Sequence, residues 1–314
     1  MMMSATSALA PMAPITSRRA TPLTSHRAVA LAAFTTRTRA RLTVSTTTRA
    51  AIFQNAAAKQ QAVDRLEAQL SPAAATTRRP LMAGNWKMNP KTLAEAETLA
   101  ALVAAAAKAD GGIARSHADV LCCPPAAFLA PMAKILEGSG VSLGVQNIYH
   151  TKEGAYTGET SLTMAKSVGC TFALVGHSER RELFGETDEL VGLKTRAILD
   201  AEFTAVVCIG ESKEQYDGGL VKDVCGEQLA GALQNVSADE IATGKVVIAY
   251  EPVWAIGTGL TATPAIAQSV HAFIRGWVRS TFGDAAANAV IIQYGGSVKP
   301  DSVDELMRCP DVDG

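Results

Sequence analysis

Short apolar segments recur along residues 80–314, and each is followed by a longer stretch with helical periodicity. Several of them, such as VVIAY at 246–250, are apolar at successive positions rather than at alternate ones. Strands buried on both faces show this pattern, which is typical of a parallel sheet covered by helices. The pattern predicts seven strands, at Leu81–Trp86, Val120–Cys123, Val141–Val145, Thr171–Val175, Ala205–Ile209, Val246–Tyr250 and Ala289–Gln293.

The stretches between these strands predict helices, and the fold class is therefore α/β. Residues 263–280 carry one apolar stripe, and Thr263 followed by Pro264 is a favourable helix start. Residues 188–201 carry a similar face. Seven βα units of this kind begin either an open doubly wound sheet or a closed barrel, so the pattern alone leaves both open.

Polar residues at the strand ends favour the barrel. Lys87, His177, Glu211, Glu251 and Ser297 each come at or just after the end of a predicted strand. In a barrel these ends converge around one mouth, whereas an open sheet spreads them along a line. The sequence therefore predicts a single site at the carboxyl ends of the strands.

Charge divides the chain into two parts. Residues 1–55 contain seven Arg and sixteen Ser or Thr, but no Asp, Glu or Lys. Such composition is typical of an organellar transit peptide, in a plastid or alternatively in a mitochondrion. We expect residues 1–55 to be this leader, 56–79 to be a linker with one short helix, and 80–314 to be the folded domain.

Composition narrows the function classes further. The net charge is −1 and 48% of the residues are hydrophobic, which is ordinary for a globular protein and gives no reason to expect a nucleic-acid partner. The longest uncharged apolar run is too short to span a membrane. The six cysteines lack CxxC or Cys/His spacing, so we expect free thiols and no metal.

Two motifs place a cation and an imidazole at strand ends. In GNWKMN at 84–89, Lys87 follows Asn85 at the end of the first strand. An ammonium at that point attracts an anionic substrate and stabilises an oxyanion, although a solvated surface lysine is the ordinary alternative. In GHSERR at 176–181, His177 comes just before a predicted helix start, where the helix dipole keeps an imidazole neutral. A structural hydrogen-bonding histidine is the alternative there.

Two further motifs supply a carboxylate and glycine-rich loops. Glu251 closes the strand in YEPVWAIGTG at 250–259, where partial desolvation makes a carboxylate a better general base. The segment that follows has Pro-Val-Trp and Gly-Thr-Gly around an apolar tip, which is a candidate lid or an ordinary loop. In YGGS at 294–297, backbone N–H groups beside Gly295 and Gly296 are able to approach a phosphate closely.

Together these segments resemble the triosephosphate isomerase family over residues 80–314. The motifs GVQNIY, GAYTGE and VVCIGE at 144–149, 154–159 and 206–211 match the family as well. The resemblance implies a (β/α)8 TIM barrel that interconverts dihydroxyacetone phosphate and glyceraldehyde 3-phosphate. It also implies no cofactor, no metal, no membrane or nucleic-acid partner, and a homodimer.

The resemblance implies a role for each matching residue. Glu251 is the base, His177 is the neutral electrophile, and Asn85 and Lys87 bind substrate and stabilise negative charge. The implied phosphate contacts are Gly257, Gly295, Gly296 and Ser297. Thr157 is implied to reach into the neighbouring subunit, and the other implied supporting residues are Glu179, Glu211, Trp254 and Tyr294.

The resemblance also identifies a departure at the C-terminus. The chain stops at Asp313-Gly314, where the family begins its eighth strand. We therefore expect the eighth βα unit to be missing and the first and seventh strands to be left as unpaired edges. A catalytically impaired barrel that acts as an interaction protein is the alternative function.

Overall fold

The computed structural model describes residues 78–109, 118–256 and 262–314. The predicted leader and nearly all of the predicted linker lie outside these ranges. Arg78 and Arg79, the last residues assigned to the linker, are described, and both bind the folded domain. The Arg78 guanidinium lies 2.7 Å from the Asp313 carboxylate, and that of Arg79 lies 2.7 Å from Asp119.

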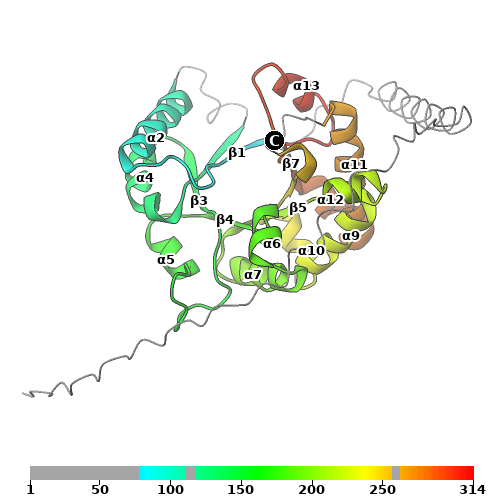
Figure 1. The fold of residues 1–314 in the computed structure, drawn as a ribbon, viewed down its shortest axis with the longest axis horizontal. Coiled ribbons are helices and arrows are strands. Elements are labelled where there is room, and N and C mark those ends of the chain that lie inside the picture. The colour runs from blue at the N-terminus through cyan, green and yellow to red at the C-terminus, as the bar shows by residue number, and fades with distance from the viewer. Residues whose placement is uncertain (1–77, 110–117, 257–261) are drawn as a thin grey trace, which may run out of the picture. The chain divides into compact units, whose positions relative to one another are not determined.

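Seven parallel strands form one sheet in the described part of the chain, and each pairs with the next in sequence order. Figure 1 shows the sheet curving around a central space with helices outside it. This is the predicted TIM-barrel arrangement rather than an open doubly wound sheet. The strands are β1 (Leu81–Asn85), β2 (Asp119–Cys123), β3 (Val141–Val145), β4 (Phe172–Val175), β5 (Thr204–Ile209), β6 (Val246–Tyr250) and β7 (Ile291–Tyr294).

The helices begin at residues that cap them well. Thr92 forms a capping box with Glu95, and the Thr263 hydroxyl accepts from the Ile266 N–H at the predicted start with Pro264. The predicted helices at 263–280 and 188–201 are confirmed as α11 and α7. The helices are α2 (Leu93–Lys108), α4 (Leu129–Leu136), α5 (Leu162–Ser167), α6 (Ser178–Phe184), α7 (Asp188–Asp200), α8 (Lys213–Asp217), α9 (Val221–Ala232), α10 (Ala238–Ala242), α11 (Pro264–Phe282), α12 (Asp284–Ala289) and α13 (Val303–Met307), with short 3-10 turns η1 (Ala126–Phe128) and η2 (Val253–Ala255).

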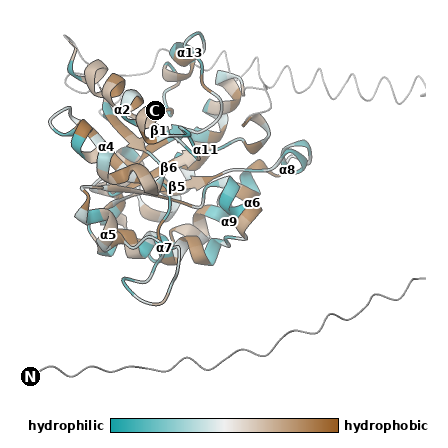
Figure 2. Ribbon diagram, turned by 60° about the vertical axis from the view of Figure 1, so that its left-hand side comes forward, coloured by the Kyte–Doolittle hydropathy of each residue, from teal (hydrophilic) through white to brown (hydrophobic). Residues whose placement is uncertain are grey.

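The core has two layers on the two sides of the sheet. A small inner cluster fills the barrel and includes Leu121, Leu174, Val206 and Val247. A larger outer cluster packs the strands against the helices. All five residues of β6 are buried, as the unbroken apolar run VVIAY predicts. In Figure 2 the central strands β5 and β6 are pale to brown, whereas hydrophilic residues gather on outer helices such as α8.

The seam between β1 and β7 is bridged at its base by the last two residues. The Leu81 N–H donates to the Asp313 carbonyl oxygen at 2.9 Å, and the Asp313 N–H donates to Ile292 at 2.8 Å. The Tyr294 N–H also donates to the Gly314 carbonyl oxygen at 2.9 Å, and the C-terminus lies beside β1 in Figure 1. The prediction that the first and seventh strands are unpaired edges is therefore wrong for β7, which is paired as far as its last residue, and for Leu81 at the start of β1, because Asp313 and Gly314 pair with both strands.

Above that base the seam is open among the described residues. Ala83 and Gly84, in the middle of β1, are exposed, although the other strands are buried at comparable positions. Leu102 on the neighbouring helix α2 is also exposed. The structure is thus a nearly closed seven-stranded barrel, which agrees with the predicted (β/α)8 fold lacking one unit.

Candidate active site

A cavity of about 760 Å³ opens at the carboxyl ends of the strands and extends down the seam between β1 and β7, where Met82, Ala83 and Gly314 line it. The walls of this cavity include eight of the residues that the sequence predicted for the site. Segments up to about 200 residues apart in the chain therefore meet here, as the barrel topology requires. These eight residues are Asn85, Lys87, His177, Glu251, Tyr294, Gly295, Gly296 and Ser297.

Lys87 is fixed by its own backbone at the end of β1. Its φ is +52°, a conformation that side chains other than glycine rarely adopt. The Lys87 N–H donates to the Asn85 side-chain oxygen at 2.9 Å, and the Gln146 amide donates to the Lys87 carbonyl at 2.9 Å. The Lys87 ammonium lies 2.6 Å from Glu179, which places this predicted supporting residue beside the cation. The hydrogen bond from Gln146 to Lys87 was not predicted, because the position of a polar residue after a strand does not indicate which backbone carbonyl its side chain will bind.

His177 precedes the first residue of α6 and has a defined tautomer. Its Nδ1 accepts from the Glu179 N–H at 3.3 Å, so Nδ1 carries the lone pair. The proton of the neutral ring is therefore on Nε2, which lies 2.9 Å from a carboxylate oxygen of Glu251. The side chain of His177 is also nearly buried. His177 thus presents a single N–H donor toward the base.

Glu251 is a buried carboxylate whose position is tightly defined. Only 5% of the residue is exposed, and its second oxygen accepts from the Ser178 N–H at 3.0 Å. A Cβ on Gly210 would lie 1.7 Å from the Glu251 carbonyl oxygen, and one on Gly295 would lie 2.9 Å from its Cγ. Both glycines therefore leave the space that Glu251 occupies.

Glu211 holds the start of the loop that follows β6. It is fully buried, and one of its oxygens accepts from the Tyr250 hydroxyl at 3.0 Å and from Trp254 Nε1 at 2.8 Å. Burial raises the pKa of the Glu211 carboxyl, although these two hydrogen bonds oppose the rise. The predicted supporting residues Glu211 and Trp254 therefore bind each other.

The other end of the loop is held from β7. The Ala262 N–H donates to the Tyr294 hydroxyl at 3.3 Å, and the Ser297 hydroxyl donates to the Ala255 carbonyl at 3.0 Å. A Cβ on Gly296 would lie 2.2 Å from the Tyr294 hydroxyl, so a side chain there would displace the tyrosine. Gly257, the remaining predicted phosphate contact, lies outside the described residues.

A carboxylate, an imidazole N–H and an ammonium that share one cavity are suited to proton transfer next to a carbonyl. A family model described as triosephosphate isomerase matches residues 80–314. The chain belongs to the triosephosphate isomerase family.

Relatives in bacteria share this similarity. A triosephosphate isomerase of Herpetosiphon aurantiacus is 50% identical over 237 residues, which cover 76% of this chain and 92% of the relative. Enzymes of the same name from Chloroflexus aurantiacus and a Roseiflexus species are 48% and 47% identical over 75% and 76% of this chain and 91% and 90% of theirs. Membership in the triosephosphate isomerase family confirms the predicted TIM-barrel fold and the predicted class of enzyme, an isomerase.

Thr157, which the resemblance assigns to a contact with a neighbouring subunit, does not reach the cavity. Thr157 lies in an exposed loop after β3 and is not among the cavity-lining residues. The same loop carries Tyr149 and Tyr156, whose rings pack with their centroids 4.3 Å apart. A contact of Thr157 with a neighbouring subunit stays a prediction.

A buried ion network behind α6 was missed by the sequence reasoning. The Lys194 ammonium lies 2.5 Å from Glu186 and 2.7 Å from the Asn147 side-chain oxygen, and Arg180 also binds Glu186. Burial by itself would raise the pKa of Glu186, but the hydrogen bonds from Lys194 and Arg180 outweigh it and lower that pKa. The network connects α6, which begins just after His177, to α7 and to the segment that follows β3. The sequence pattern of α7 does not indicate that Lys194 points inward, because a lysine on an amphipathic helix is expected on the solvent face.

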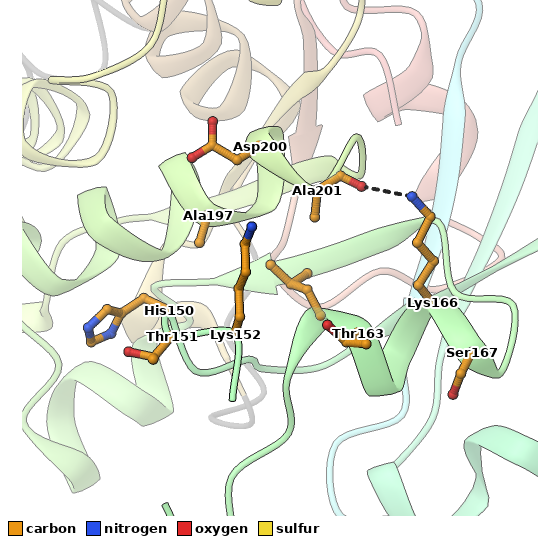
Figure 3. A pocket seen from close by; sticks show the side chains of 10 residues that line it. His150, Thr151, Lys152, Thr163, Lys166, Ser167, Ala197, Asp200 and Ala201 are labelled. Carbon is orange, nitrogen blue, oxygen red and sulfur yellow. Dashed lines mark hydrogen bonds between the residues drawn. The ribbon is translucent and has the colours of Figure 1, made fainter. Parts of the chain in front are cut away.

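A second cavity, of about 510 Å³, lies away from the strand ends. Figure 3 shows it between the loop after β3, α5 and α7, with Lys152 and Lys166 on two of its sides. The Lys166 ammonium is turned to the Ala201 carbonyl, at 3.5 Å. None of the predicted site residues lines this cavity, so the mouth of the barrel is the candidate active site.

Within residues 78–109, 118–256 and 262–314, no group of three His, Cys, Asp or Glu side chains is placed to hold a metal ion. None of the helices in these ranges is long and apolar enough to cross a membrane.

Proposed function

We propose that the chain interconverts dihydroxyacetone phosphate and glyceraldehyde 3-phosphate by proton transfer through an enediolate. The observation that carries the proposal is the 2.9 Å approach of His177 Nε2 to the Glu251 carboxylate in the cavity that Lys87 also lines. A neutral imidazole donor beside a carboxylate base is the pair of groups that this chemistry needs. In this enzyme family a carboxylate base and a neutral histidine have these roles.

Each group has one task in the reaction. Glu251 accepts the proton from C1 of dihydroxyacetone phosphate while the C–H electrons form the C1–C2 double bond and the C2 carbonyl becomes an enediolate oxygen. The Nε2–H of His177 moves protons between the two enediolate oxygens. Protonated Glu251 then gives its proton to C2, which produces glyceraldehyde 3-phosphate. Lys87 stabilises the negative charge of the enediolate and of the phosphate.

Substrate binding changes one of the two hydrogen bonds that hold Glu251. One oxygen of Glu251 is held by His177 and the other by the Ser178 N–H. When the substrate carbonyl accepts the hydrogen bond from His177, Glu251 loses one of these two donors. The phosphate is expected near Gly295, Gly296 and Ser297, which line the same cavity.

An assay of the isomerisation with Glu251→Asp tests the proposal. The substitution shortens the base by one methylene group and should lower kcat by roughly 100-fold, because a displacement of about 1 Å has that effect on a reacting group. Glu227→Asp, at an exposed position on α9, is the matched control and should be unchanged. Near wild-type kcat in Glu251→Asp would refute the assignment of the base, and a folded but inactive wild-type chain would favour the interaction-protein alternative.

We also propose that the protein is a homodimer. Large apolar side chains stand exposed on the side of the site, where Met88 is 91% exposed and Leu183 and Phe184 are 69% and 67% exposed. Exposed apolar groups of this size favour burial against a partner. Thr157 then lies in a loop suited to cross the interface. Sedimentation should give the mass of two chains, and Phe184→Asp should shift it to one chain.

We further propose that residues 1–55 direct the protein to the plastid stroma. The support is the composition of this segment, which is rich in Arg, Ser and Thr and lacks acidic residues. A stromal enzyme of this kind would serve the Calvin cycle as well as glycolysis and gluconeogenesis. Imaging of a fluorescent protein fused to residues 1–79 tests the compartment, and accumulation in mitochondria would overturn the plastid assignment.

Finally, we propose that an eighth βα unit covers the open seam in the active enzyme. Exposure of Ala83 and Gly84 in β1 and of Leu102 on α2 supports this, since these positions face packed neighbours in a closed barrel. Isomerase activity should rise when a strand and helix taken from a relative are added after Gly314. Equal activity without them would contradict the proposal.

A further inference from the structure

A buried imidazole outside the cavity lies between the two strands that carry the base and the phosphate loop. His271, on α11, is fully buried, and its Nδ1 lies 3.1 Å from the Asp311 carbonyl oxygen. Because a carbonyl oxygen only accepts, Nδ1 carries the proton and Nε2 carries the lone pair. Nε2 is buried without a hydrogen-bond partner among the described residues.

The charged groups around His271 are few. Arg275, one helical turn further along α11, binds the carboxylates of Asp311 and Asp313. Burial lowers the pKa of His271 to about 4, and Arg275 acts in the same direction, while Asp311 opposes it. The ring is therefore neutral near pH 7, and its hydrogen bond to Asp311 fixes the plane of the ring.

Two tyrosine rings lie against this fixed imidazole. Tyr250 meets His271 edge-on, with ring centroids 5.8 Å apart and an angle of 87° between the planes. Tyr294 lies on another side, with centroids 6.5 Å apart. In the sequence, Tyr250 directly precedes the base Glu251, and Tyr294 directly precedes the Gly295-Gly296-Ser297 loop.

Each tyrosine hydroxyl continues the contact to one end of the loop after β6. Tyr250 binds Glu211, which also binds Trp254 at the start of that loop. Tyr294 accepts from Ala262 at its end. The His271 imidazole therefore contacts both Tyr250 and Tyr294. These two tyrosines adjoin Glu251 and the phosphate loop, and they hold the two ends of the loop after β6.

We infer that His271 is a positioning residue for the isomerisation, acting on Glu251 through Tyr250 and on the phosphate loop through Tyr294. The inference rests on the proposed function. A buried ring nitrogen without a partner destabilises the fold, so packing alone would favour an apolar side chain at position 271, and the positioning role gives a reason for a histidine there. The anchored ring has two parts: the Nδ1–H that fixes it and the faces and edges that the tyrosines contact.

Two variants of the full chain separate these parts. His271→Phe keeps an aromatic ring but loses the anchor, and His271→Gln keeps an N–H donor but loses the ring. Ile241→Ala is the control, because Ile241 is equally buried but lies on α10, away from the cavity. The melting temperature, kcat and KM for dihydroxyacetone phosphate are measured for all three and for the wild type at 10 °C.

We expect kcat/KM to fall about tenfold or more in both His271 variants. The kcat should fall because Glu251 is displaced, and KM should rise because the phosphate loop is displaced. Ile241→Ala should lose as much thermal stability while its kcat and KM stay within about twofold of wild type. His271 variants that lose stability but keep wild-type kcat and KM would overturn the inference, and so would variants that do not fold at 10 °C. If the wild type itself is inactive, the proposed function has failed instead.

Discussion

A graded series of glycine-to-alanine substitutions tests how closely the backbone around Glu251 defines the base. A Cβ added at Gly276 on α11 meets nothing within 4 Å, one at Gly295 meets Glu251 Cγ at 2.9 Å, and one at Gly210 meets the Glu251 carbonyl oxygen at 1.7 Å. The same methyl group is thus added against no neighbour, against a side chain and against a backbone atom. None of the three glycines has a φ in the left-handed region, so backbone strain does not complicate the comparison.

The distances give the size of each displacement. Ordinary contact between a Cβ and an oxygen needs about 3.4 Å, so Gly210→Ala forces β5 and the start of the loop after β6 apart by roughly 1.7 Å. Gly295→Ala needs a shift of only about 0.5 Å, which a side-chain rotation can supply. We therefore expect kcat to fall on the order of 100-fold in Gly210→Ala and by less than about tenfold in Gly295→Ala. Gly276→Ala should keep wild-type kcat and gain up to about 1 kcal/mol of stability, because alanine favours a helix interior.

Steady-state kinetics and thermal unfolding together decide the outcome. Our expectation is that the order of kcat follows the order of the contacts. The KM for a phosphate-bearing substrate should change most in Gly295→Ala, because Gly295 belongs to the phosphate loop. Wild-type kcat in a folded Gly210→Ala variant would refute it, since Glu251 would then tolerate a displacement that the geometry forbids. A Gly295→Ala variant impaired more than Gly210→Ala would refute it as well.

Four further changes follow from single contacts. Lys87→Ala should weaken a phosphate-bearing inhibitor on the order of 100-fold in calorimetry, because a charged hydrogen-bonding partner is lost, and unchanged affinity would contradict its role. Glu211→Ala should lower the free energy of unfolding in urea by about 2–4 kcal/mol, because the Tyr250 and Trp254 donors lose their acceptor. Glu211→Gln keeps an acceptor and removes a carboxyl whose pKa burial raises, so it should lower that free energy by less than about 1 kcal/mol. Lys194→Met should lower the free energy of unfolding by roughly 3–5 kcal/mol, because the buried Glu186 carboxylate loses its Lys194 partner. Lys166→Met, which removes an exposed ion pair, should leave it unchanged in the same urea titration. The unfolded chain binds a proton at His271 that the fold does not, so between pH 7.5 and pH 5 the wild type should lose about 2 kcal/mol more stability than His271→Gln, and parallel pH profiles would exclude that assignment.

The sequence could predict those parts of the fold that depend on local pattern. Successive apolar residues in β6 predict a strand buried on both faces, and Thr263-Pro264 predicts the start of α11. The convergence of Lys87, His177 and Glu251 followed from topology, because parallel strands in a barrel bring all their carboxyl ends to one mouth.

Other features depend on contacts that no local pattern encodes. Gln146 follows β3 as any polar residue does, and only the barrel brings its amide to the Lys87 carbonyl. Lys194 lies on an amphipathic helix, where a charged residue is expected to face water, and its burial depends on Glu186 from another segment. The pairing of Asp313 and Gly314 across the base of the seam was missed for a different reason: two residues are too few to show a strand pattern, but they are enough to bridge two neighbouring edges.

The base and the histidine are each held by backbone as well as by side chains, and this explains how one cavity can hold them in defined states. His177 is made a single-proton donor by the Glu179 N–H, and Glu251 is oriented by the Ser178 N–H, so both receive their orientation from the first turn of α6. The ion network of Glu186 fixes that turn from behind, through Arg180. A shift of α6 would therefore change the tautomer of His177 and the direction of Glu251 together. The two catalytic groups are coupled because both accept hydrogen bonds from the first turn of the same helix.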